Sequence, residues 1–292
     1  MSRLRRLTAV ALLAAAALVL SGCSLIQSLA PQGSTHTDED VPAELERFYK
    51  QDLSWKSEGN RIDTTKVIVP LDWSDPGGET IEIAIARHHA KGEKLGSLLI
   101  NPGGPGGSGF DYVRDYAQYV VSTEVLERYD IIGFDPRGVN HSTPVVCYTD
   151  GAQRDQWLYG TYDAAYGTQA WVDELTARAA DYTAACEENT GPLLAHIDAA
   201  SVARDMDVIR AVLGDEKINY LGYSYGTYLG AVYAELFAEK VGRMVLDGAV
   251  DPQVSDLDAL GQRIFLTGGQ RVSGRISARR SGRRAGRAGS AP

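Results

Sequence analysis

The chain of 292 residues is long enough for one large domain or two small ones, and its 44% hydrophobic residues can form a core. The formal net charge is −9, and all 38 acidic residues lie between residues 38 and 258. A body with this acidic surplus is not expected to bind nucleic acid.

The N-terminus predicts export. Arg3, Arg5 and Arg6 precede an apolar run over residues 8–20, which is followed by Ser21-Gly22-Cys23. The run is shorter than a membrane span of about 20 residues, and the small residues before the cysteine resemble a lipobox. We therefore predict a lipoprotein signal peptide over residues 1–22, with an uncleaved N-terminal anchor as the alternative.

If the signal peptide is cleaved, Cys23 becomes the lipidated N-terminus of the mature protein. The protein would then be held at the outer face of the cell membrane by its lipid, and secretion is the alternative location. Residues 23–40 mix Ser, Gln, Thr, Pro and Gly with little apolar surface, so they predict a flexible tether. Cys147 and Cys186 remain, and two thiols in an exported domain are expected to form a structural disulfide. No Cys and His spacing approaches a zinc pattern, so no metal is expected.

We predict a domain over residues 41–266, and the first part of it is predicted to consist of strands. Residues 66–71 and 80–87 are β-rich runs separated by an Asp-Pro-Gly-Gly turn, which predicts an antiparallel pair. Residues 96–101 predict a third strand. This strand runs into a glycine-rich loop over residues 101–109, whose backbone N–H groups are accessible to an oxyanion. A phosphate cradle is the competing interpretation, but the loop lacks the Lys-Ser/Thr pair of a Walker motif.

Alternation of strand and helix follows. We predict a helix over residues 112–129 and a strand over 130–134, which together indicate a parallel sheet with right-handed crossovers. The strand ends in Asp135-Pro136-Arg137-Gly138, where Asp135 and Arg137 are expected to form an ion pair that locks the turn. His141, in the loop just beyond, is expected to be structural.

Residues 142–197 predict an excursion outside the sheet, with helical pieces such as residues 168–187. The pattern then resumes in a helix over residues 201–213, whose apolar residues recur at helical spacing. Gly214 is the expected C-terminal stop of this helix. A last strand is predicted over residues 241–246.

Between these elements, residues 217–221 predict a buried strand and residues 228–237 predict a helix. Gly222-Tyr223-Ser224-Tyr225-Gly226 joins them and is typical of a nucleophile elbow. The glycines would let the strand and helix backbones pass closely without a β-carbon clash, while the strained turn pushes the Ser224 hydroxyl outward.

This order of elements is similar to that of an α/β-hydrolase, a mostly parallel sheet with flanking helices. Within that fold, the glycine loop, Asp135 to Gly138, the elbow and Val245-Leu246-Asp247-Gly248 resemble the exported tripeptidyl aminopeptidases and proline iminopeptidases of bacteria. The resemblance covers about residues 42–260. It implies a serine exopeptidase that releases short peptides from the N-terminus of a peptide substrate, without metal or organic cofactor.

By the same resemblance, Ser224 would attack the scissile carbonyl. The N–H of Tyr225, together with that of Gly104 or Gly103, would form the oxyanion hole, and each such donor typically contributes about 2.7 to 4 kcal/mol of transition-state stabilisation. The family's catalytic acid and histidine follow the serine in the chain. Here all five histidines precede Ser224, and the acid is not identifiable, because Asp247 belongs to a strand-end motif.

We therefore expect that the chain lacks the family's last strands and lid, and that its activity is impaired. Residues 267–292 hold seven arginines and no acid, and they predict a disordered basic tail that arises from a shifted or interrupted reading frame. A natural tail that binds anionic lipid is the alternative. An esterase on the same scaffold and a non-catalytic lipid-anchored binding domain remain as alternative functions.

Overall fold

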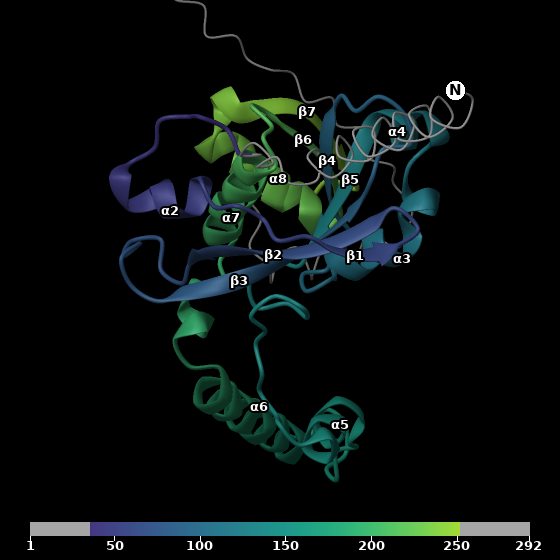
Figure 1. Cartoon of the computed structure of the whole chain (residues 1–292). Helices are drawn as coiled ribbons and strands as arrows, with labels where there is room; N and C mark the ends of the chain where they lie inside the picture. Colours follow the sequence, from purple (N-terminus) through teal and green to yellow (C-terminus); the bar gives the residue numbers. More distant parts are fainter. Residues whose placement is uncertain (1–35, 252–292) are drawn as a thin grey trace, which may run out of the picture. The chain divides into compact units, whose positions relative to one another are not determined.

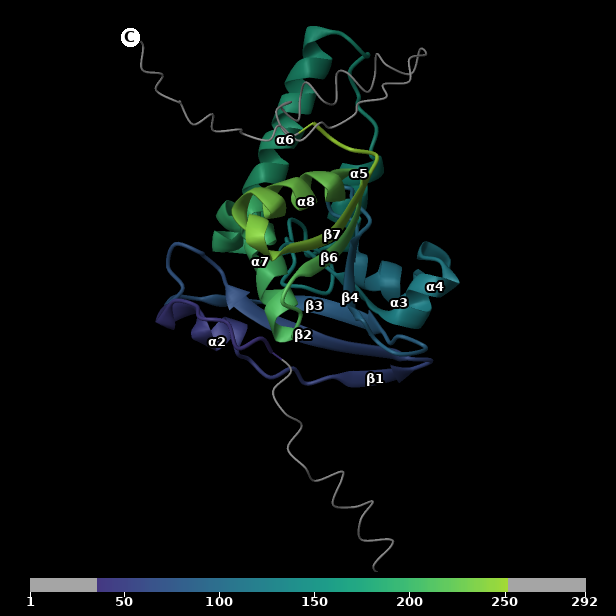
Figure 2. The same ribbon diagram turned by 90° about the horizontal axis from the view of Figure 1, so that it is seen from above.

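The computed structural model describes residues 36–251, which form a seven-stranded sheet with helices on both of its faces (Figures 1 and 2). The strands lie in the order β1-β2-β3-β5-β4-β6-β7. Their bounds are β1 (Lys56–Gly59), β2 (Ile62–Pro70), β3 (Thr80–His88), β4 (Gly96–Asn101), β5 (Tyr129–Phe134), β6 (Ile218–Tyr223) and β7 (Val241–Asp247).

The helices and 3-10 turns precede β1 or lie between the strands from β4 onward. Their bounds are η1 (Ala43–Leu45), α2 (Glu46–Tyr49), α3 (Gly109–Val120), α4 (Thr123–Arg128), α5 (Gly151–Tyr159), α6 (Gln169–Thr190), η2 (Gly191–His196), α7 (Ala199–Val212), α8 (Tyr225–Leu236) and η3 (Ala238–Lys240). Figure 2 shows α3 and α4 on one face of the sheet, and α7 and α8 on the other.

The sheet is mixed. Strands β5, β4, β6 and β7 run parallel to one another, and β1, β2 and β3 form an antiparallel extension that joins them through β3 and β5. The predicted antiparallel pair and the parallel core are therefore confirmed. No strand follows β7 within residues 36–251, so the part of the sequence resemblance that concerns later strands lies outside the described residues.

The predicted helices differ from the structure at their ends. The helix expected over residues 112–129 is divided into α3 and α4, because Val121 and Ser122 are extended and α4 begins at Thr123. Helix α3 begins earlier than predicted, at Gly109, where the Ser108 side chain accepts a hydrogen bond from the Asp111 N–H. Helix α7 is buried along most of its length and is followed by Gly214 with φ +78°, as expected of a helix stop.

The excursion between β5 and α7 carries α5 and α6, which Figure 1 shows clear of the sheet. Helix α5 has no buried residue, and Cys186 is the buried residue of α6. Cys147 and Cys186 are joined by a disulfide that ties the start of the excursion to α6. The excursion is therefore held by this bond and by local packing, such as the stacking of Trp157 on Tyr182, more than by a core of its own.

The domain begins before residue 41, the start that the sequence predicted. The N–H of Thr37 donates to the Ala211 carbonyl oxygen at 2.8 Å, and the Glu39 carboxylate forms ion pairs with Arg210 and Lys240. The last residues of the predicted tether thus belong to the domain. The signal peptide, Cys23, the rest of the tether and residues 252–292, including the basic tail, lie outside the described residues.

Glu39 belongs to a charged cluster that joins the N-terminal segment to α7 and the region after α8. At its centre the buried Asp207 accepts hydrogen bonds from Tyr49, Tyr233, Arg210 and Lys240, at 2.7 to 3.0 Å. Burial alone would raise the pKa of Asp207, but the hydrogen bond and charge of Arg210, with Lys240 and Tyr49, outweigh it and hold the pKa below its ordinary value.

The stability of the domain is expected to fall at acid pH because of this cluster. The folded state lowers the pKa of Asp207 below the ordinary value of 3.8, so the contribution is complete above that value and is lost as the pH falls through the lower folded pKa. Asp207→Asn should unfold at lower urea concentration at neutral pH and lose less further stability on acidification. The measurement is the urea midpoint between pH 7 and pH 3.

Asp155→Asn is the matched control, because Asp155 lies in an ion pair with Arg154 whose two side chains are exposed. Its urea midpoints should follow those of the unchanged protein at every pH. If Asp207→Asn and the unchanged protein lose stability in parallel on acidification, Asp207 does not carry the acid sensitivity.

Candidate active site

The elbow predicted around Ser224 lies between the end of β6 and the start of α8. Ser224 has φ 51° and ψ −118°, a backbone conformation that non-glycine residues rarely adopt. Its N–H donates to the Asp247 carbonyl oxygen at 2.9 Å, and its carbonyl oxygen accepts from the N–H and the hydroxyl of Thr227. These bonds to β7 and α8 hold the strained turn in place.

The two glycines of the elbow are required by close backbone contacts. A β-carbon on Gly222 would lie 2.4 Å from the Gly226 carbonyl oxygen, and one on Gly226 would lie 2.8 Å from the carbonyl oxygen of Asn101. Real β-carbons do not approach oxygen this closely, so any larger residue would force the backbone to move. The close passage of strand and helix expected from the sequence is therefore present.

The glycine-rich loop lies directly against the elbow. A β-carbon on Gly103 would lie 2.4 Å from the Tyr223 carbonyl oxygen and 3.0 Å from the Ser224 β-carbon. The Gly103 N–H donates to the Asn101 side-chain oxygen at 2.9 Å, so this donor is already used. Of the two loop amides that the sequence left open for the oxyanion hole, Gly103 is thus paired within the loop, and Gly104 is exposed.

Asp135 holds the far end of this loop and does not pair with Arg137, so the expected ion pair between them is wrong. The buried Asp135 carboxylate accepts from the Ser108 hydroxyl at 2.6 Å, the Phe110 N–H at 3.1 Å and the His141 N–H at 2.9 Å. It thus joins the end of the glycine loop and the start of α3 to the loop after β5.

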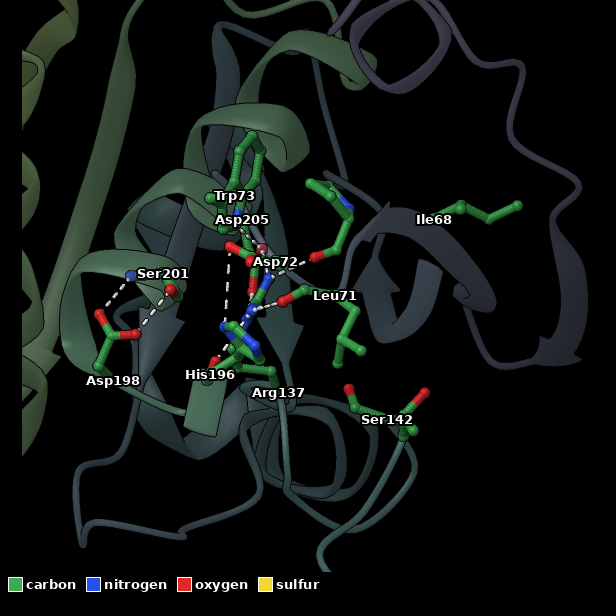
Figure 3. Close-up of polar contacts among 12 residues, drawn as sticks. Ile68, Leu71, Asp72, Trp73, Arg137, Ser142, His196, Asp198, Ser201 and Asp205 are labelled. Carbon is green, nitrogen blue, oxygen red and sulfur yellow. Dashed lines mark hydrogen bonds and ion pairs between the residues drawn. The ribbon is translucent and has the colours of Figure 1, made fainter. Parts of the chain in front are cut away.

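Arg137 turns instead toward α7, where it forms a bidentate ion pair with Asp205 at 2.7 Å (Figure 3). Its remaining donors reach the backbone carbonyls of Pro70, Leu71 and His196. Both charged side chains are buried, and burial raises the pKa of Asp205 although Arg137 opposes that rise. Asp205 was missed in the sequence because an acid in a helix is typical of a solvated face.

No histidine completes a triad within the structure. All five histidines lie among the described residues, and none of them makes a hydrogen bond to Ser224. Three of them have acidic partners elsewhere, where the ring nitrogens of His89, His141 and His196 lie 2.6, 2.8 and 3.8 Å from carboxylate oxygens of Asp63, Asp111 and Asp72. Asp247 contacts the elbow through its backbone carbonyl oxygen, which accepts from the Ser224 N–H. The Asp247 side chain is exposed.

The site holds no metal-binding cluster in the part of the chain that the structure describes. Within residues 36–251, no three His, Cys, Asp or Glu side chains gather closely enough to coordinate an ion. In the same residues, no helix combines the length and apolar character needed to span a membrane.

Replacing Gly103 by alanine is expected to destabilise the domain more than the same change at Gly106. Both glycines have φ +91°, so alanine costs roughly 1–2 kcal/mol of backbone strain at either position. The added β-carbon meets nothing within 4 Å at Gly106, but at Gly103 it collides with the elbow backbone. Overpacking of this kind typically costs about 1–3 kcal/mol more.

The measurement is the free energy of unfolding in urea for the two alanine variants, with Gly106→Ala as the matched control. Equal losses at the two positions would mean that the glycine loop does not press against the elbow in solution.

The strand order, the elbow between β6 and α8, and the glycine loop beside it together define an α/β-hydrolase. Comparison with known families supports the same assignment, because residues 96–289 match the family described as the alpha/beta hydrolase fold. The chain belongs to the α/β-hydrolase family.

Its relatives are hydrolases of bacteria. The chain is 38% identical over 251 residues to the serine protease Hip1 of Mycobacterium tuberculosis (strain ATCC 25618 / H37Rv), a match that covers 85% of this chain and 47% of the relative. It is 43% identical over 190 residues to a tripeptidyl aminopeptidase of Streptomyces coelicolor, covering 64% of this chain and 35% of the relative. It is 46% identical over 194 residues to carboxylesterase B of M. tuberculosis, with 66% and 37% covered.

These relatives relate the chain to serine peptidases and esterases of this family. The chain spans about half the length, or less, of the curated relatives that it matches.

Proposed function

We propose that the chain is a serine hydrolase domain of peptidase type, whose nucleophile is Ser224 and whose substrate is a peptide cleaved near its N-terminus. The observation that carries the proposal is the position of Ser224, at the tip of a strained elbow against the glycine loop. The likeness to Hip1 and to a tripeptidyl aminopeptidase supports a peptide as the substrate.

The chemistry is acyl transfer. The Ser224 hydroxyl oxygen attacks the carbonyl carbon, a base removes the hydroxyl proton, and the bond from that carbon to the leaving group breaks as the leaving group takes up that proton. Water then cleaves the acyl group from Ser224 and restores the hydroxyl. The N–H groups of Gly104 and Tyr225 would stabilise the negative charge on the carbonyl oxygen, because they lie at the loop and at the first residue of α8. Because no histidine bonds to Ser224, we propose that turnover by this chain is impaired and that the base must be supplied from outside it.

An esterase is the second candidate, and it is favoured by the 46% identity to carboxylesterase B. The elbow and the oxyanion loop serve either reaction, since both pass through a tetrahedral intermediate. A non-catalytic binding domain is the third candidate function.

Acylation of Ser224 in the presence of added imidazole separates the three candidates. The substrates are p-nitrophenyl esters of a tripeptide with a free amino terminus, of the same tripeptide with an acetylated amino terminus, and of acetate. We expect mass spectrometry to find the free tripeptidyl group on Ser224, with release of p-nitrophenol above the rate of the Ser224→Ala variant.

Faster acylation by acetate than by either peptide would favour the esterase. Equal acylation by the free and the acetylated tripeptide would contradict an exopeptidase that recognises the amino terminus. A folded protein that binds the tripeptide without any acyl group on Ser224 would identify a binding domain.

For location, we propose a lipid anchor on Cys23 at the outer face of the membrane. The reason is the basic start, the short apolar run and the small residues before Cys23. Cys23→Ala should be recovered in the soluble fraction of the producing cell. A variant that still pellets with membranes would leave an uncleaved N-terminal anchor as the explanation.

A further inference from the structure

A cavity of about 300 Å³ opens beside the elbow, between the glycine loop, the loop after β5 and the starts of α7 and α8. Val202 of α7 and Leu229 of α8 are buried at its base, and Val139 forms part of its wall. Gly103 and Tyr225 also line it, and these are the residues that flank Ser224 on either side. The cavity is thus adjacent to the proposed nucleophile.

Most residues of the lining are apolar. Asn101, Arg137 and Tyr225 are the lining residues with polar side chains, and Arg137 is not available to a ligand. Its five N–H donors are all used, by the two oxygens of Asp205 and by three backbone carbonyls (Figure 3). A bound carboxylate would therefore find a positive charge that is already neutralised and a guanidinium with no N–H left to donate. An uncharged apolar group, in contrast, needs no hydrogen-bond partner in the cavity.

We propose that this cavity receives a small, uncharged apolar side chain or acyl chain that is attached to the carbonyl attacked by Ser224. The assignment rests on the proposed acyl-transfer function of Ser224. It makes Val139 and Ile197, two apolar lining residues that are not fully buried, side chains that select the substrate. Ligand pockets typically measure about 300–1,000 Å³, so this one takes a group of modest size.

The position of the cavity explains why it would act on the acyl side of the bond. Tyr225 lines the cavity, and its N–H is one of the two donors proposed for the oxyanion. A substrate whose carbonyl oxygen points at that N–H carries its acyl substituent past the same residue. The leaving group then lies on the other side of the tetrahedral carbon.

Acylation by esters that share one leaving group tests the selection. We compare p-nitrophenyl acetate with p-nitrophenyl butanoate in the presence of imidazole, and divide each rate by the rate without protein. Burial of two further methylenes should favour the butanoyl ester by about tenfold. Val139→Trp fills the cavity and should bring the ratio close to one, whereas Val172→Trp, on the exposed part of α6, should keep it.

The outcomes separate this proposal from the proposed function. No acyl group on Ser224 from either ester would contradict the nucleophile. Acylation by both esters without a butanoyl preference, or with a preference that survives Val139→Trp, would leave the nucleophile in place and overturn the assignment of the cavity.

Binding provides a second test that needs no reaction. Butyramide and succinamate have the same chain length, but succinamate carries a carboxylate in place of the terminal methyl group. In the Ser224→Ala protein, butyramide should shift the backbone NMR signals of Gly103, Gly138 and Tyr225, and succinamate should not. Equal shifts from both amides, or shifts that persist in a Ser224→Ala, Val139→Trp protein, would show that the cavity does not select apolar groups.

Discussion

Purified protein with these 292 residues is expected to hydrolyse tripeptide p-nitroanilides about a million-fold more slowly than a serine peptidase with a complete triad. Loss of the serine or the histidine of a triad costs about this factor in kcat, and the residual rate comes from the oxyanion hole and from substrate binding. In the structure Ser224 is in place, but none of the five histidines bonds to it. Its hydroxyl therefore has no base to take its proton and is a weak nucleophile.

The comparison that tests this expectation is with Ser224→Ala, measured under the same conditions. The two rates should agree within about tenfold, because a serine without a base adds little to the oxyanion hole and to binding. A rate of ordinary size that Ser224→Ala abolishes would mean that a histidine of this chain, or of a second copy, reaches Ser224. Alanine substitutions of His141 and His196, one at a time, would then identify it.

Arg137→Ala is expected to cost about 3–5 kcal/mol of folding free energy, the largest stability loss predicted for this domain. The change leaves the Asp205 carboxylate buried without its partner, which is the costly way to break such a pair. It also removes the donors to three backbone carbonyls that connect β2 and the end of the excursion to α7. Urea unfolding followed by circular dichroism measures the loss.

Arg154→Ala is the control for this prediction, because Arg154 also pairs with an aspartate, but both side chains are exposed. Exposed pairs contribute between zero and about 1 kcal/mol, so the control should unfold close to the unchanged protein. Asp205→Asn should be destabilised as well, since the Arg137 charge then remains buried without a carboxylate. If Arg137→Ala and Arg154→Ala lose the same small amount, the buried pair does not organise the junction between β5 and α7.

The order of strands and helices followed from the sequence because it depends on local patterns. Strand β4 was predicted at its observed bounds, 96–101, and the antiparallel pair at β2 and β3 was expected from the turn between the two apolar runs. The elbow was recognisable for a similar reason. The Gly-x-Ser-x-Gly pattern between a buried strand and a helix predicted a close crossing of their backbones, and the contacts of Gly222 and Gly226 show that crossing.

Only the tertiary structure decided the partners of the charged residues. Asp135 and Arg137 are two positions apart, so an ion pair between them was the local expectation. Arg137 instead reaches Asp205, 68 positions away, and Asp135 binds the end of the glycine loop. Sequence spacing does not report such distances, because the partner is fixed by which helix packs on which strand.

The same limit applied to the loop amides and to the start of the domain. The sequence alone predicted a serine nucleophile beside accessible backbone amides and left Gly103 and Gly104 equivalent. The fold distinguishes them, because the Asn101 side chain turns back and takes the Gly103 N–H. It also joined Glu39 to Arg210 and Lys240, in a segment whose composition alone predicted a tether. Composition indicates how much apolar surface a segment can bury by itself. Folding adds ion pairs with charged residues that are distant in the sequence, such as Arg210 of α7.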